Sequence, residues 1–170
     1  MGGQTFTEPL EVRKDPNSGG SLEGIRAQTA LLFDIQKSLQ SSNGMIDTLE
    51  LRRKSLADIR SSLSGAANRD LLSGADTLEQ KLIAVEGKLN QLMTTGRGQD
   101  GVRYPVMLSG QLGYLAGTVD GSDEQPTTQA RAAFKYLDDQ VAAVRREFLR
   151  VMQEAEQYQA RLRARNIVSN

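Results

Sequence analysis

The sequence predicts an all-α fold, an antiparallel up-down helical bundle of two long helices and two shorter ones. Apolar residues recur at alternating spacings of three and four over most of the chain, and short segments rich in glycine, serine and proline separate these runs. The start differs: QTFTEPLEVRKDP, Gln4 to Pro16, has the alternating pattern of a single β-strand. We therefore expect a strand remnant and linker over residues 1–16 and a helical domain over residues 17–170.

The first long helix is expected from about Ser21, a candidate N-cap, to Ser64. Its apolar residues form two series with a period of seven, and the pattern keeps its phase across Asn43-Gly44, which argues against a loop there. The first series is Ile25, Leu32, Leu39 and Ile46; the second is Ile35, Leu49, Leu56 and Leu63, with polar members Gln28 and Ser42. At about 1.5 Å per residue this helix extends roughly 65 Å.

The second and third helices are expected after a turn at Gly65–Asn68. The third is shorter, follows a flexible loop over residues 94–101, and places Pro105 in its first turn. Its glycines predict the close approach of a neighbouring helix. The apolar positions are Leu71, Ala75, Leu78, Leu82, Val85, Leu89 and Leu92 on the second helix and Leu108, Leu112, Leu115 and Val119 on the third, whose glycines are Gly110, Gly113 and Gly117.

The last helix has the most regular apolar pattern. Thr127 or Thr128 is expected to cap it, after a loop over residues 120–126. Its series keeps the three-four spacing throughout and comprises Ala130, Phe134, Leu137, Val141, Val144, Phe148, Val151, Ala155, Tyr158 and Leu162. Such an apolar series does not reveal whether the helix that packs against it lies in the same chain. The alternative to a bundle within one chain is therefore a free-standing coiled-coil adaptor or a homodimer. Loops of about four to ten residues favour pairing within the chain.

Composition excludes several kinds of site and partner. Lys+Arg and Asp+Glu both count 21, so no net charge attracts nucleic acid or anionic lipid. No apolar run reaches the roughly 18 residues of a membrane span. The absence of His and Cys removes the usual proton shuttle, thiolate ligands and every Ser-His or Cys-His pair. We predict no catalytic residue, no cofactor and no metal, and neither a nucleic-acid nor a membrane partner.

Several short patterns resemble functional motifs but are better explained as surface structure. Gly96–Gly101 matches G-x-G-x-x-G, but a helix rather than a strand precedes it, so no dinucleotide site is predicted. The acids of residues 120–124 lack the spacing of a calcium loop. Acids of the last helix interleave with arginines on a solvated face. The arginines of residues 161–165 complement the dipole at a helix C-terminus.

One loop is a candidate contact for a partner protein. Tyr104, Pro105, Val106 and Met107 bring an aromatic ring, a proline and two apolar side chains together in four positions. These residues predict a small exposed apolar patch. The alternative interpretation is a hydrophobic plug over one end of the bundle.

Two phrases, together with the order of the helices around them, carry a resemblance to a known family. The phrase "TFTEPLEVRKDP", then long helices, then "GVRYPVMLSGQLGYLAGTVDGSDEQPT" and a final helix resemble the C-terminal region of bacterial BNR-repeat, sortilin-like β-propeller proteins, often labelled glycosyl hydrolases. In that family a propeller is followed by an Ig-like β domain whose last strand ends in a similar phrase, and a helical region closes the chain. The resemblance extends over nearly all of this sequence.

The resemblance implies an explanation for the unpaired strand. Gln4 to Arg13 would be the last strand of an upstream Ig-like β domain. It also implies export to the periplasm or outside the cell, a signal peptide upstream, and hydrolase activity confined to the propeller. No catalytic residue of the family maps onto this sequence. We therefore expect a non-catalytic accessory domain, structural or protein-binding, whose partners are its own upstream β domains or another protein.

Overall fold

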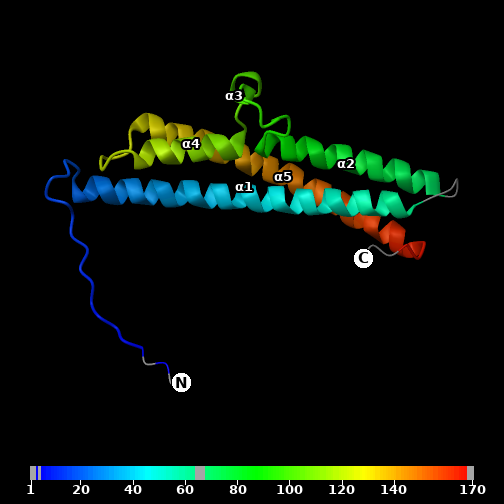
Figure 1. The fold of residues 1–170 in the computed structure, drawn as a ribbon, viewed down its shortest axis with the longest axis horizontal. Helices are drawn as coiled ribbons and strands as arrows, with labels where there is room; N and C mark the ends of the chain where they lie inside the picture. The colour runs from blue at the N-terminus through cyan, green and yellow to red at the C-terminus, as the bar shows by residue number, and fades with distance from the viewer. Residues whose placement is uncertain (1–2, 4, 64–67, 168–170) are drawn as a thin grey trace.

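The computed structural model describes residue 3, residues 5–63 and residues 68–167. The fold of these residues is all-α, as the sequence predicts, with helices α1 (Leu22–Ser62), α2 (Arg69–Leu89), α3 (Asp100–Arg103), α4 (Leu108–Asp120) and α5 (Thr128–Ala164). Figure 1 shows the chain running along α1, returning through α2 and α4, and running forward again along α5, which crosses the others obliquely. The expected turn at Gly65–Asn68 lies outside the described residues, except for Asn68.

Helix α1 is one continuous helix of 41 residues and is about 62 Å long. The side chain of Ser21 caps it by accepting a hydrogen bond from the Gly24 amide at 2.9 Å. Asn43 and Gly44 lie within the helix, as the unbroken phase predicts. α2 and α4 both pack on α1, one after the other along its length (Figure 1).

Only one of the two predicted series on α1 faces the core fully. Ile35 and Leu49 of the second series are completely buried, whereas Leu32 and Leu39 of the first series are only partly buried. The buried stripe of α1 also includes residues that belong to neither predicted series. These are Leu31, Met45 and Ile59 together with Gly24 and Ser38.

The polar members of this stripe are buried because each has a hydrogen-bond partner. The side-chain amide of Gln28 donates to the carbonyl of Val119, at 2.7 Å, and to that of Ser122, at the C-terminal end of α4. Ser42 donates to a backbone carbonyl within α1, at 2.9 Å, and Ser38 donates to the carboxylate of Asp138 on α5. These bonds fix α1 against α5 and the end of α4.

The apolar stripes of the later helices agree with the sequence. The predicted residues of α2 from Leu71 to Leu89 are buried, but Leu92 lies beyond the helix and is partly exposed. On α5 every predicted position is buried or half-buried. Thr127, rather than Thr128, caps α5 by accepting a hydrogen bond from the Ala130 amide at 3.1 Å.

The expected N-terminal strand is not formed. Residues 5–15 have no regular secondary structure, and the described part of the chain contains no strand with which they could pair. Phe6, Leu10 and Val12 are 83%, 88% and 88% exposed. A lone extended segment leaves its backbone groups to water, so it gains no ladder to stabilise it.

The linker after this segment is fixed against the loop between α4 and α5. The hydroxyl of Ser18 donates to the carboxylate of Asp123 at 2.5 Å. Gly20 is buried beneath the same residue, and a Cβ there would overlap the Asp123 carbonyl. The chain therefore enters α1 at a fixed position.

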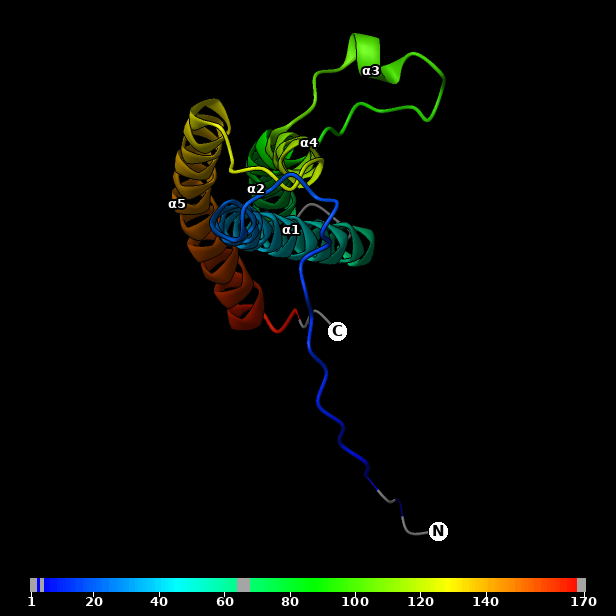
Figure 2. The same cartoon turned by 90° about the vertical axis from the view of Figure 1, so that its left-hand side faces the viewer.

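An insert comprising residues 90–107 separates α2 from α4 and projects from the side of the molecule (Figures 1 and 2). It contains α3, which was not predicted. The prediction that Pro105 lies in the first turn of the third helix is wrong. α4 begins at Leu108 with Met107 as its N-cap, because Pro105 to Met107 lead the chain from the insert back to α1.

One ion pair between α1 and α2 is largely buried. The side chain of Glu86 is 1% exposed, and its carboxylate lies 2.7 Å from the guanidinium of Arg53, which is 32% exposed. The neighbouring pair of Arg52 with Glu156 on α5 is more open, since Glu156 is 59% exposed. The two pairs provide a comparison of buried and exposed charge in one molecule.

We expect Gly20→Ala to lower the free energy of unfolding by about 1–3 kcal/mol, because the added Cβ would press on a backbone carbonyl. Chemical denaturation followed by circular dichroism measures this change. Gly44→Ala, within α1, is the matched control, since none of the described residues lies within 4 Å of its Cβ position, and it should be neutral or stabilising by up to about 1 kcal/mol. Equal effects of the two substitutions would contradict the fixed linker.

We expect Arg53→Met to destabilise the fold by about 3 kcal/mol, because it leaves the buried Glu86 carboxylate without its partner. Adding Glu86→Leu should restore most of that loss. The control Arg52→Met should cost no more than about 1 kcal/mol, because its partner is exposed. Denaturation midpoints of the three variants and the unchanged chain test this, and a double variant no more stable than Arg53→Met would refute it.

Candidate partner-binding site

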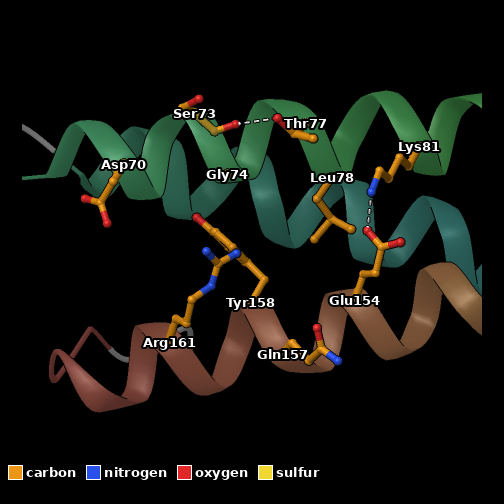
Figure 3. A pocket seen from close by; sticks show the side chains of 10 residues that line it. All are labelled: Asp70, Ser73, Gly74, Thr77, Leu78, Lys81, Glu154, Gln157, Tyr158 and Arg161. Carbon is orange, nitrogen blue, oxygen red and sulfur yellow. Dashed lines mark hydrogen bonds and ion pairs between the residues drawn. The ribbon is translucent and has the colours of Figure 1, made fainter.

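The groove between α2 and α5 is polar and bridged by ion pairs (Figure 3). It has a volume of about 690 Å³. Lys81 pairs with Glu154 across it, and Lys88 pairs with Glu147 further along the same two helices. These pairs close the seam between α2 and α5 with opposite charges.

The same seam is also closed at its far end. Arg165 donates to both carboxylate oxygens of Asp70, at 2.9 and 2.6 Å, and these bonds lower the pKa of Asp70 below its ordinary value. A bidentate arrangement of this kind fixes the orientation of both side chains. The C-terminal end of α5 is thereby held to the start of α2.

Tyr158 on α5 forms the floor of the α2–α5 groove. Its ring is 1% exposed, its hydroxyl donates to the Leu71 carbonyl at 3.0 Å, and burial raises its pKa. The Arg161 guanidinium lies 5.4 Å from the ring centroid, and Gly74 allows the ring to contact the backbone of α2, since a Cβ there would lie 3.2 Å from a ring carbon. This groove is a packed structural seam between two helices.

A second groove lies between α4 and α5 and has the opposite character. This α4–α5 groove has a volume of about 860 Å³, and its lining includes Val106, Tyr114, Ala133 and Tyr136. None of the side chains that line it is charged. Among the described residues, no ion pair joins α4 to α5. This half of the molecule therefore lacks the charged seam that closes the other half.

Large side chains stand exposed on both walls of the α4–α5 groove. Tyr114 of α4 is 80% exposed and Tyr136 of α5 is 64% exposed, and Val106 lies at the edge with 53% exposed. Neither tyrosine was predicted as a contact residue. Exposed aromatic side chains beside an uncharged hollow are typical of surfaces that bind a partner.

The glycines of α4 do not mark a close approach within this chain. Among the described residues, nothing lies within 4 Å of a Cβ built on Gly113 or on Gly117. Gly110 accommodates the side chain of Val106, which a Cβ would overlap. Among the described residues, no neighbouring helix therefore approaches any of the three glycines, and α4 is open at Gly113 and Gly117.

The four predicted contact residues lie at the base of the insert, midway along the molecule (Figure 1). The alternative of a plug over the end of the bundle is therefore wrong. Val106 lines the α4–α5 groove; Pro105 is exposed, and Tyr104 and Met107 are half-buried. Side-chain amides hold this base, because Gln91 donates to the Pro105 carbonyl at 3.0 Å and Gln111 to the Val106 carbonyl at 2.7 Å.

The glycine-rich stretch of the insert binds its own carboxylate. Asp100 accepts hydrogen bonds from the amides of Thr95 and Gly96, both at 2.7 Å, and from the Thr95 hydroxyl at 2.9 Å. Desolvation alone would raise the pKa of Asp100, but these bonds favour the charged form and the net effect lowers it. Gly96 has a φ of 72°, which glycine adopts without strain. These backbone amides, which a phosphate would need as donors, are therefore already bonded to the Asp100 carboxylate.

Within residues 5–63 and 68–167, no group of three or more acidic side chains is placed to hold a metal ion. No helix of this part of the chain is both long enough and apolar enough to cross a membrane.

Comparisons with protein-family models, with curated proteins and with solved structures find no match to this chain. The class of the molecule is therefore defined by its fold and surface. Its described residues form an all-α fold with a charged seam between α2 and α5, an uncharged groove between α4 and α5, and a projecting insert.

We expect the insert to lose its hydrogen bonds to Asp100 as the pH falls. Because the pKa of this carboxyl is lowered in the folded chain, its stabilising effect is present above the ordinary value of 3.8 and is lost as the pH falls through the lower folded value. Amide hydrogen exchange of Thr95 and Gly96 by NMR, corrected for the intrinsic rates, measures this.

The same amides should lose protection at neutral pH in Asp100→Asn, which removes the charge but keeps the side-chain shape. Asp120→Asn, at the end of α4, should leave them protected. Unchanged protection in Asp100→Asn would mean that other contacts order the insert.

Proposed function

We propose that this chain is a non-catalytic accessory domain, an antiparallel up-down bundle that supports a larger assembly and binds a protein through its α4–α5 groove. One observation carries this proposal: α5 packs on both α2 and α4, yet within the described residues ion pairs join it to α2 and none joins it to α4. Water contacts an apolar, uncharged surface in the other seam, and covering that surface is favourable.

The chemistry of the α4–α5 groove fits a protein partner. Tyrosine supplies a large contact area with few rotatable bonds and is enriched at the centres of interfaces. Tyr114 and Tyr136 stand on opposite walls, and Val106 extends the apolar surface to the base of the insert. Tyr104, Pro105 and Met107 flank this surface and form its edge.

We infer further that this domain belongs at the C-terminal end of an exported β-propeller protein, in the periplasm or outside the cell. Two features support this: the resemblance of its phrases to that family, and an N-terminal segment that extends away from the helices (Figure 1). Phe6, Leu10 and Val12 are exposed there and free to join the sheet of a preceding β domain. Hydrolase activity of such a protein would reside in its propeller. Hydrolysis of a glycoside by the present chain alone would contradict this role.

A photo-crosslinking experiment tests the binding surface. A benzophenone amino acid is placed at Tyr114 or at Tyr136, one position at a time, in the chain expressed in its native host. Ultraviolet irradiation should give a covalent protein adduct, identified by mass spectrometry, at both positions.

Gln157 is the matched control position, since it lines the α2–α5 groove of the same helix. No adduct is expected there. Absence of adducts at both tyrosine positions, or an equal yield at Gln157, would overturn the proposed function of the α4–α5 groove.

A further inference from the structure

The lack of charge in the α4–α5 groove restricts which partner can bind there. The groove has no charged lining, and α4 itself carries a single charged residue, Asp120, at its last position. On α5 the nearby Lys135 and Asp139 pair with each other at 2.8 Å. A charged peptide would find no counter-charge here, whereas an equally uncharged surface would leave no charge unpaired.

The shape of the same face supplies both halves of a self-complementary contact. Tyr114 projects from α4 and is 80% exposed, while Gly113 and Gly117 beside it leave the backbone open, with nothing within 4 Å of their Cβ positions. Two glycines weaken a helix of 13 residues, although no part of the chain that the structure describes comes within 4 Å of their Cβ positions. A helix from outside the chain can make the close approach that these glycines allow.

The N-terminal segment of the same chain is directed elsewhere. Ser18 and Gly20 hold the linker against Asp123. From this point the segment leaves on the side of α1 opposite to α4, as Figure 2 shows. The segment therefore does not cover the groove of its own chain.

We propose that the α4–α5 groove is covered by a second copy of this chain, packed about a two-fold axis. This rests on the proposed function, in which the same groove binds a protein, and it names that protein. In a two-fold contact the same patch faces itself, so projections and hollows must lie on one surface and like charges must be absent from it. Tyr114 of each copy then lies against the open glycine face or the groove of the other.

Analytical ultracentrifugation of the purified chain tests this contact. The mass should rise with concentration from 18.6 kDa towards that of a dimer. Gly113→Arg places a charge in the contact of both copies and should weaken dimerisation by at least about tenfold. Gln157→Arg, in the α2–α5 groove, is the matched control and should dimerise like the unchanged chain. Circular dichroism confirms that both variants fold.

Each contrary outcome can be told apart. A chain that stays monomeric at all concentrations, or a dimer that Gly113→Arg leaves intact, overturns the two-fold contact. A chain that begins at residue 15 should still dimerise, and loss of the dimer would assign the contact to the N-terminal segment instead. Crosslinks from Tyr114 to a different protein, with a monomeric chain, would overturn this inference while the proposed function stands. A monomer without any crosslink would overturn both.

Discussion

The length of α1 is the constraint on which the rest of the structure depends. A continuous helix of 41 residues presents an apolar stripe about 62 Å long, which must be covered along its whole length. α2, with 21 residues, covers only part of it, and α4 covers the remainder. Because two helices share one side of α1, the chain has to leave and rejoin it between them. The insert projects at that junction (Figure 1).

The two halves created by this division are held together differently. The half that contains α2 is closed by ion pairs to α5 and by the buried pair of Arg53 with Glu86. In the other half, α4 is held in place by its contacts with α1, above all by the hydrogen bonds from Gln28 of α1 to carbonyls at the end of α4. α4 is therefore fixed by its contacts with α1. The α4–α5 groove, on its other side, is left uncharged and open to solvent. That difference, rather than any reactive group, is what points to function here.

The sequence predicted part of this surface. Val106 was among the residues expected to contact a partner, and it lines the α4–α5 groove. Tyr114 and Tyr136 were missed because the prediction of helix packing considered only the apolar series, and neither tyrosine belongs to the series of its helix. Their positions off the series, together with the near absence of charge on α4, were signals that could have found them. The groove itself was not predictable, because it arises only where two helices distant in sequence meet.

By itself the sequence determined the all-α class, the continuity of α1 across Asn43-Gly44, the cap at Ser21, the choice of Thr127 or Thr128 as the cap of α5, and the apolar stripes. These follow from local periodicity and from hydrogen bonds between near neighbours in the chain. Only the tertiary structure decided that residues 5–15 form no strand, which of the two series on α1 is buried, and that the glycines of α4 lie open. Each of these depends on which partner lies opposite, and a partner distant along the chain leaves no mark on local spacing.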